Sequence, residues 1–237
     1  MGTGVLVIGS SGMGKSASMR NFDNLAVINV LGKPFPFKNE KIKALIESDP
    51  DRIIDLLQRT KANAIVIDDA GYINTNFYMK NKAPITAKMG DKYAVYDTLA
   101  TNFWKIINCI NALPPEKIVY VFMHEDVSEG GKIKPKTIGK LLDDKVCIEG
   151  YFSIVLRSDK LEGKYIFQTN TDGASVTKSP MGMFPETVDN DLKEVDKVIR
   201  EYYGLSAPAK SKTNPPAEQT PAASGAEGSA ENQNGGV

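Results

Sequence analysis

The residues best suited to chemistry lie near the N-terminus, directly after the apolar run Val5–Ile8. Eight consecutive residues fit the pattern G-x-x-x-x-G-K-[ST]: Gly9, Ser10, Ser11, Gly12, Met13, Gly14, Lys15 and Ser16. Glycines let a backbone curl so that successive N–H groups converge on a phosphate, and the next helix adds its positive dipole end. Lys15 would reach the β- and γ-phosphates, and the Ser16 hydroxyl would hold Mg²⁺. The motif therefore predicts a loop that binds ATP with Mg²⁺.

Two carboxylates follow a second apolar run, Ala64–Ile67. Strands often end in aspartate because this residue initiates turns. In phosphate-loop enzymes, however, an acid at the end of a buried strand orients a water on Mg²⁺. We expect Asp68 to have that role and Asp69 to polarise the attacking water. If Asp69 is not the base, Glu40 and Glu125 are the next residues to test.

His124 is the only histidine, and it directly follows the apolar run Ile118–Met123. Most single histidines beside apolar runs are structural. At this place, next to the strand that carries the acids, a polar ring lies beside the γ-phosphate in many phosphate-loop ATPases. We therefore expect His124 to sense the nucleotide.

Two long segments, Tyr72–Tyr93 and Glu125–Lys140, are predicted to be loops at the same edge of the sheet, and long loops in compact domains are usually functional. Lysines neutralise phosphates and aromatic rings stack on unpaired bases, so these loops are candidates for contact with single-stranded DNA. A solvated lysine-rich surface is the alternative. The candidate DNA contacts are Lys80, Lys82, Lys88, Lys132, Lys134 and Lys136.

Strand and helix signals alternate along the chain, which predicts an α/β fold with a mainly parallel sheet flanked by helices on both faces. The predicted strands are Val5–Ile8, Leu25–Val30, Ala64–Ile67, Ile118–Met123, Tyr151–Leu156 and Lys164–Gln168. The predicted helices begin near Lys15 and at Asp49-Pro50, and span residues 95–110 and 189–203. Residues 1–205 form one predicted domain, and residues 206–237, rich in Ala, Pro, Ser, Gly and Glu, a disordered tail.

The composition indicates which cellular location and which classes of partner to expect. Lys and Arg together number 29, as do Asp and Glu, so any basic surface must be local. Cys109 and Cys147 lack metal-ligand spacing, which favours a reduced cytoplasmic location. No stretch is apolar and long enough to span a bilayer, so no membrane partner is expected.

With the loop Gly9–Ser16, the acids Asp68-Asp69, and His124 before a basic segment, the chain resembles the RecA-core AAA-type ATPases encoded by bacteriophages. The resemblance covers about residues 4–203, and the motif Pro-Lys-Thr-Ile-Gly-Lys at 135–140 adds to it. Several members serve beside single-strand annealing proteins in phage recombination. The resemblance implies a RecA-like P-loop fold and DNA-associated ATP hydrolysis, with an annealing or single-strand binding protein as a partner in the host cytoplasm.

The resemblance also assigns roles to individual residues. Lys15 and Ser16 would bind ATP–Mg²⁺, Asp68 would be the second-motif acid, and His124 the switch residue before a DNA-binding loop. Recombinases of this core place a catalytic glutamate just after the second strand, but residues 29–34 contain none, so either Asp69 substitutes or hydrolysis is slow. Members act as rings or filaments in which a neighbour's Lys or Arg completes the site. The candidates for that residue are Lys140 and Arg157.

Two other functions fit the motif. A nucleotide or small-molecule kinase would need several arginines around the transferred group, and of the five arginines only Arg157 falls near the expected site. A nucleotide-gated assembly or packaging factor would bind ATP and scarcely hydrolyse it. The missing glutamate favours that second alternative.

Overall fold

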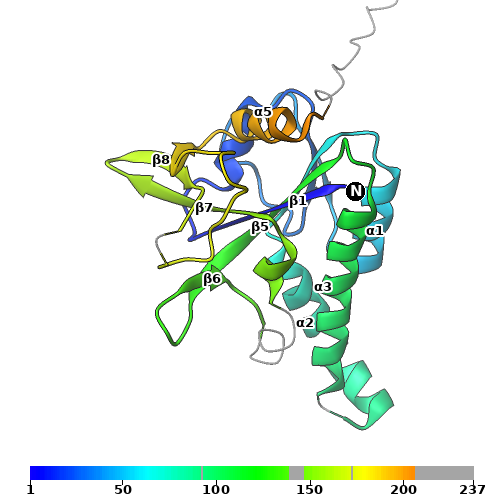
Figure 1. The fold of residues 1–237 in the computed structure, drawn as a ribbon. Coiled ribbons are helices and arrows are strands. Elements are labelled where there is room, and N and C mark those ends of the chain that lie inside the picture. The colour runs from blue at the N-terminus through cyan, green and yellow to red at the C-terminus, as the bar shows by residue number, and fades with distance from the viewer. Residues whose placement is uncertain (92, 139–146, 172, 206–237) are drawn as a thin grey trace, which may run out of the picture.

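A mostly parallel, mixed β-sheet flanked by helices forms the centre of the computed structural model (Figure 1), which describes residues 1–91, 93–138, 147–171 and 173–205. The strand order is β3-β2-β4-β5-β1-β7-β8-β9, and β6 pairs with β5 outside this path. The pairs from β3 through β7 are parallel, whereas β7–β8, β8–β9 and β5–β6 are antiparallel. The strands are β1 (Thr3–Gly9), β2 (Ala26–Asn29), β3 (Lys43–Ile46), β4 (Ala64–Asp68), β5 (Ile118–Val127), β6 (Ile133–Pro135), β7 (Ile154–Leu161), β8 (Lys164–Gln168) and β9 (Thr187–Asp189). The α/β class and the mainly parallel sheet are thus confirmed.

Helices cover both faces of the sheet, as the alternating signals predict. The helices are η1 (Ser16–Asn21), α1 (Pro50–Arg59), α2 (Gly71–Met89), α3 (Ala94–Ala112), η2 (Ile148–Tyr151) and α5 (Leu192–Tyr203). Alternate residues of each central strand enter two separate cores. Leu6 and Ile8 of β1 pack with α1 and α3 on one face, whereas Val5 and Val7 pack with η1 and α5 on the other. Burial on both faces explains why the central strands are continuous apolar runs.

The strand order brings three chain segments together at one edge of the sheet. In the register of the parallel strands, Gly9 at the end of β1 lies opposite His124 on β5. On the other side of β5, Ile67 pairs with Val121, so Asp68 follows at the same edge. The carboxyl ends of β1, β5 and β4 therefore surround one crevice, which is where ligands bind in open α/β sheets.

The interpretation of Tyr72–Tyr93 as a long loop is wrong. Residues Gly71–Met89 form α2, which ends at Gly90, a residue with φ of 65° whose N–H donates to the carbonyl of Thr86 at 2.9 Å. The sequence of this helix has no apolar stripe, and accordingly only Ile73 and Asn74 are buried. Pro84 lies inside the helix. Contacts with α3 stabilise α2 where its own sequence pattern does not.

The interpretation of Glu125–Lys140 as a loop is wrong for residues 125–135. Strand β5 continues past the apolar residues to Val127 and pairs with β6, so Glu125 lies opposite Pro135 in an antiparallel hairpin. This hairpin projects from the same edge of the sheet as α2 (Figure 1). The apolar run ends at Met123, because the polar residues His124, Glu125 and Asp126 follow it, whereas the strand continues to Val127.

Three smaller differences concern element boundaries. The helix after the phosphate loop is a six-residue 3₁₀ helix, Ser16–Asn21, rather than a longer α-helix. The edge strand β3 escaped prediction because all four of its residues are exposed. The last helix begins at Leu192, because residues Thr187–Asp189 pair with β8 as a strand.

Two expectations concern the chain as a whole. The segment 206–237, predicted to be a disordered tail, lies outside the described residues. Within the described part of the chain, no helix combines the length and apolar character needed to cross a membrane.

Candidate nucleotide-binding site

The phosphate loop has the backbone that its glycines predict. Gly12 and Gly14 have φ angles of 81° and 92°, which residues with side chains rarely adopt. A Cβ at Gly14 would also lie only 3.1 Å from Oδ1 of Asn190. The Asn190 side chain donates to Ser158 Oγ at 3.1 Å, and Ser158 donates to the carbonyl of Met13. Two buried polar side chains from outside the loop thus fix its shape.

Lys15 lies inside the loop rather than in solvent. Its side chain is buried, and Nζ donates to the carbonyl oxygens of Gly9 at 2.6 Å and Ser10 at 2.9 Å. Burial lowers the pKa of Lys15, and the charges of Asp69 and Asp68 oppose this shift. The ammonium is therefore held at the mouth of the loop by weak neutral acceptors. A phosphate oxygen would be a stronger, charge-assisted partner for it.

The two residues predicted to hold Mg²⁺ are in contact. Ser16 Oγ donates to Asp68 Oδ1 at 3.0 Å, and Asp68 is only 6% exposed. Burial and then the charge of Asp69 raise the pKa of Asp68 to about 6, against the lowering effect of the Ser16 hydrogen bond. A buried carboxylate that is ionised at a cost is a group that a cation would stabilise.

Asp69 adopts an unusual backbone conformation, with φ of 61°. This left-handed turn lets the next N–H, that of Ala70, donate to the carbonyl of Phe122 on β5 at 2.8 Å. The Asp69 carboxylate contacts two polar groups: Lys33 Nζ lies 2.7 Å from Oδ2, and His124 Nε2 lies 3.4 Å from Oδ1. Strained backbone of this kind occurs often at functional sites.

His124 connects this acid to the β5–β6 hairpin. Its ring meets the Tyr72 ring edge-on with centroids 5.8 Å apart, and burial followed by the charge of Lys15 lowers the pKa of His124. The ring is therefore predominantly neutral near pH 7. The carbonyl of His124 accepts from the N–H of Lys136 at 2.7 Å. A displacement of His124 would act directly on the basic hairpin.

Glu125 and Arg157 form a charged cluster next to the loop. Ser10 Oγ donates to Glu125 Oε1 at 2.7 Å, and Arg157 Nε donates to Glu125 Oε2 at 2.8 Å. Arg157 also lies 2.7 Å from Asp159 Oδ2. Burial raises the pKa of Glu125, but the Arg157 and Ser10 hydrogen bonds outweigh it and the net pKa is lowered. The guanidinium predicted to complete a neighbour's site is thus engaged within its own chain, and its role toward a neighbour stays a prediction.

These groups line a cavity of about 430 Å³. Its walls come from the phosphate loop with the start of η1, the segment after β2, the end of β4, His124 on β5 and Tyr165 near the start of β8. The lining residues are Ser11, Gly12, Gly14, Lys15, Ser16, Ala17, Lys33, Pro34, Pro36, Asp68, Asp69, His124 and Tyr165. Every residue predicted to act on the nucleotide from within the chain, apart from Gly9, Ser10 and Met13 of the loop, lines this cavity.

The predicted DNA contacts lie on two elements outside the cavity. Lys80, Lys82 and Lys88 are on α2, and Lys82 Nζ lies 5.2 Å from the Tyr78 ring centroid. Lys132, Lys134 and Lys136 are on the β5–β6 hairpin or directly after it. Lys140 falls outside the described residues.

Sequence reasoning missed two polar contacts of this site. Lys33 lies in the segment noted for lacking a glutamate, yet nothing in the sequence signals that its ammonium reaches Asp69. The sequence offers Glu125 only as an alternative base, whereas its carboxylate accepts hydrogen bonds from Ser10 and Arg157. Glu40 instead pairs with Lys38 on the surface, with 68% of its side chain exposed.

Comparison with known proteins adds no assignment to this site. No family model matches the chain, and no curated protein matches it. Among the described residues, no group of three or more His, Cys, Asp or Glu side chains could hold a metal ion by itself.

Proposed function

We propose that this chain binds Mg²⁺–ATP in the cavity and hydrolyses it, and that nucleotide state controls its action on single-stranded DNA in phage recombination or replication. One observation carries the proposal: Lys15 and Ser16 of the loop meet Asp68 and Asp69 of β4 in a single cavity. The insertion of β5 between the loop strand and the acid strand supports a RecA-like core. It also supports the sensor role, because β5 carries His124.

The donor set suits magnesium. Mg²⁺ prefers hard oxygen ligands, keeps several waters and is usually bound by one or two protein groups together with substrate phosphates. Ser16 Oγ and Asp68 Oδ1 are two such oxygens, 3.0 Å apart. When bound, the ion would neutralise developing charge on the phosphates. Ser16 would hold it directly, and Asp68 would orient one of its waters.

The chain's own residues supply the remaining parts of hydrolysis. The loop N–H groups and Lys15 bind the β- and γ-phosphates. A water attacks the γ-phosphorus in line, the bond to the bridging oxygen breaks, and ADP leaves with that electron pair. Asp69 orients the water and accepts its proton. His124, neutral near pH 7, lies 3.4 Å from Asp69 and would detect the γ-phosphate beside it.

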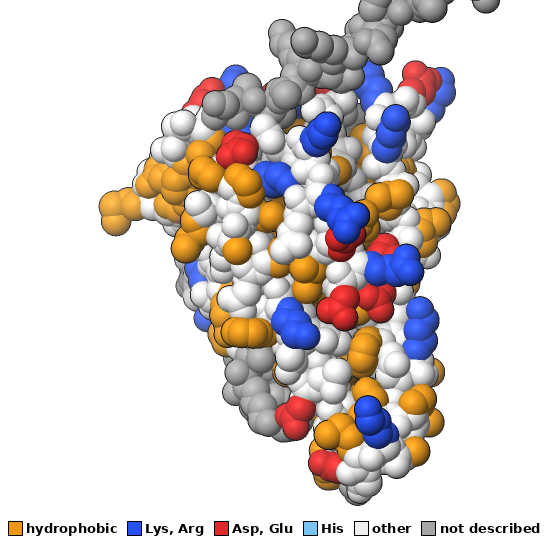
Figure 2. Space-filling model, turned by 90° about the vertical axis from the view of Figure 1, so that its right-hand side faces the viewer, with side chains coloured by type: hydrophobic (Ala, Val, Ile, Leu, Met, Phe, Trp, Pro, Cys, Tyr) orange, Lys and Arg blue, Asp and Glu red, His pale blue; other side chains and the backbone are white. Residues whose placement is uncertain are grey.

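Action on DNA would be transmitted through the β5–β6 hairpin. The carbonyl of His124 accepts a hydrogen bond from the N–H of Lys136, and Gly71 at the start of α2 lies close to the Lys136 carbonyl. Both elements with candidate DNA lysines therefore begin at the nucleotide site. Charge on the face seen in Figure 2 is mixed, so DNA contact would depend on these local groups.

Self-association into a ring or filament belongs to the same proposal. Exposed apolar side chains gather toward the bottom of Figure 2. On α2, Met79 and Met89 are 76% and 64% exposed. Such a surface is suited to burial against a second copy. An annealing or single-strand binding protein is the further proposed partner.

A specific observation favours a second candidate, a nucleotide-gated assembly or packaging factor with little turnover. The proposed base, Asp69, is paired with Lys33 at 2.7 Å, and a carboxylate held by an ammonium is a weaker base. For this candidate function, ATP binding orders the site, and most bound ATP is released without being hydrolysed. Measured turnover separates the two functions.

The proposal is tested by ATP hydrolysis and particle size, each measured with and without single-stranded DNA. Lys15→Ala should abolish tight ATP binding and turnover while the protein remains folded, because it removes the point charge on the β- and γ-phosphates. Asp69→Asn should retain Mg²⁺–ATP binding and lose most turnover. Lys61→Ala, an exposed lysine that precedes β4 at the opposite edge of the sheet, is the matched control. Unchanged turnover by folded Lys15→Ala would overturn the phosphate-loop assignment.

A further inference from the structure

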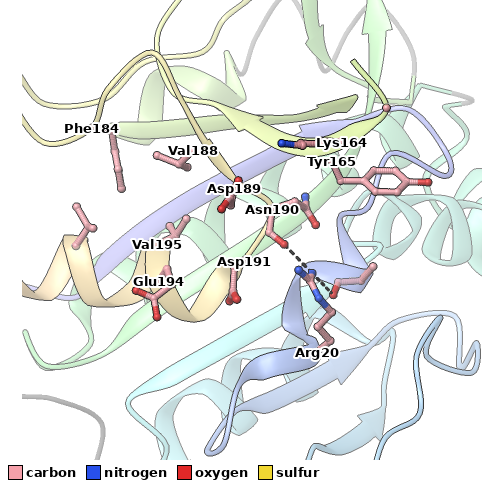
Figure 3. Close-up of a pocket in the computed structure, with 13 residues that line it drawn as sticks. Arg20, Lys164, Tyr165, Phe184, Val188, Asp189, Asn190, Asp191, Glu194 and Val195 are labelled. Atoms are coloured by element: carbon pink, nitrogen blue, oxygen red, sulfur yellow. Dashed lines mark hydrogen bonds between the residues drawn. The ribbon is translucent and has the colours of Figure 1, made fainter. Parts of the chain in front are cut away.

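A second cavity, of about 720 Å³, is formed by η1, β8, β9 and α5. It adjoins the cavity of about 430 Å³ around Lys15 and Asp68, called the phosphate cavity below. Ala17 and Tyr165 line both cavities. Ala17 directly follows the serine of the phosphate loop, so the second cavity opens where a bound triphosphate would leave the loop toward its sugar. Figure 3 shows Tyr165 and Arg20 at one end of this cavity and Phe184, Val188 and Val195 at the other.

Hydrogen bonds hold the walls of the cavity in place and leave its interior accessible. Arg20 on η1 donates from Nη1 to the carbonyl oxygens of Asn190 at 2.7 Å and Ala17 at 3.1 Å (Figure 3). Asp191 accepts from the N–H of Lys193 at the start of α5 and from Asn21 Nδ2. These contacts fix η1 against the segment that joins β9 to α5. The cavity is therefore a formed feature of the fold.

The lining combines an apolar wall with carboxylate acceptors. Phe184 and Val195 are buried core residues, and Val188 is half-buried. The side chains of Asp189 and Glu194 are exposed and make no hydrogen bond or ion pair with any other described residue. Carboxylates repel phosphates but accept hydrogen bonds from hydroxyl and amino groups. This chemistry suits a flat, partly apolar group that carries donors.

We propose that this second cavity binds the nucleoside of the nucleotide, with Asp189 and Glu194 accepting from the ribose hydroxyls and the 6-amino group of adenine. The inference rests on the proposed function, because the phosphate loop must first hold the triphosphate. The apolar wall of Phe184, Val188 and Val195 contacts the base. Tyr165, 46% exposed, stands at the junction between sugar and phosphates. The cavity thereby makes the site specific for adenosine nucleotides.

The test compares the binding of Mg²⁺–ATP, Mg²⁺–ITP and Mg²⁺–tripolyphosphate by calorimetry. Tripolyphosphate has the phosphates without a nucleoside, and inosine has an acceptor in place of the 6-amino donor. The variant is Asp189→Ala combined with Glu194→Ala. Removing negative charge alters the attraction for every polyphosphate, so the informative quantity is the ratio of the tripolyphosphate Kd to the ATP Kd. The matched control is Glu201→Ala, which removes one carboxylate about two turns beyond Glu194 along α5, outside this cavity.

The wild type should bind ATP at least about tenfold more tightly than tripolyphosphate and ITP, and the double variant should lose about tenfold of that preference. Val188→Trp, which fills the apolar wall, should weaken ATP and leave tripolyphosphate unchanged. Glu201→Ala should behave as wild type. Equal ATP preference in wild type, the double variant and Val188→Trp would overturn the nucleoside site while leaving the phosphate loop intact. Binding of none of the three ligands by the wild type would instead overturn the proposed function on which the inference rests.

Discussion

Replacing Asp68 by asparagine should stabilise the free protein and damage its handling of magnesium. Asp68 is 6% exposed, and its pKa is raised from 3.8 to about 6 by burial and the charge of Asp69. A carboxyl with a raised pKa in the folded state binds its proton more tightly when folded than when unfolded. Stability is therefore lost as pH rises through the window from 3.8 to 6.

The size of this effect follows from the shift. Above pH 7 the folded protein holds the ionised Asp68 at a cost of about 3 kcal/mol, and at pH 4.5 the cost falls to about 1 kcal/mol. An asparagine in its place keeps an acceptor for the Ser16 hydroxyl, which donates to Asp68 at 3.0 Å, but carries no charge. Asp68→Asn should raise the free energy of unfolding by about 3 kcal/mol at pH 8. The melting temperature should rise by roughly 6–12 °C in a domain of this size.

The assay is thermal or urea unfolding at pH 8 and pH 4.5, without nucleotide or metal, paired with ATP binding at several Mg²⁺ concentrations. Asp126→Asn, an exposed aspartate on β5, is the control and should change stability little at either pH. The affinity of Asp68→Asn for Mg²⁺–ATP should fall by about 10- to 100-fold. The reasoning is refuted if the asparagine variant is no more stable than wild type at pH 8, or equally stabilised at both pH values.

Three further variants test the groups around this acid and the hairpin beyond it. Lys33→Ala removes one of the two cations that line the phosphate cavity, so ATP affinity should fall about tenfold while ADP affinity changes little. Equal losses of affinity for both nucleotides would place Lys33 away from the γ-phosphate. His124→Ala should bind ATP nearly normally and lose the ATP-dependent gain in single-stranded DNA affinity; an undiminished gain would remove the sensor role. Alanine at the three hairpin lysines should weaken DNA binding in every nucleotide state and make the slope of log K against log salt shallower by about 2, whereas an unchanged slope would exclude the hairpin. The residues in the last variant are Lys132, Lys134 and Lys136.

The parts of the site that the sequence predicts are those in which local sequence determines local geometry. The loop Gly9–Ser16 follows the buried apolar run Val5–Ile8, and its glycines adopt the backbone that the pattern requires. Asp49 caps α1 by accepting from the N–H groups of Asp51 and Arg52, as aspartate before proline indicates. The position of Asp68 follows from the apolar run before it. In each case the deciding interactions lie within a few residues along the chain.

The parts that escaped prediction depend on contacts between distant residues. Helix α2 contacts α3 but buries only Ile73 and Asn74, so its sequence needs no apolar stripe. Hydrophobic periodicity therefore could not reveal this helix. The Gly90 cap was its only local signal. Lys33 reaches Asp69 because β2 and β4 are neighbours in the sheet, which no spacing in the sequence encodes. Likewise Glu125 meets Arg157 only after β7 pairs with β1.

The same strand pairing explains how one histidine would connect a bound nucleotide to the hairpin in the proposed function. Strand β5 lies between β1 and β4, so His124 on β5 is adjacent to both the phosphate loop and the acids Asp68 and Asp69. His124 lies opposite Gly9 in the register, its ring contacts Asp69, and its carbonyl holds Lys136. Any shift that a γ-phosphate imposes on Asp69 must therefore alter the environment of the His124 ring. Because binding free energies are linked, DNA held by the hairpin would in turn change ATP affinity by the same factor.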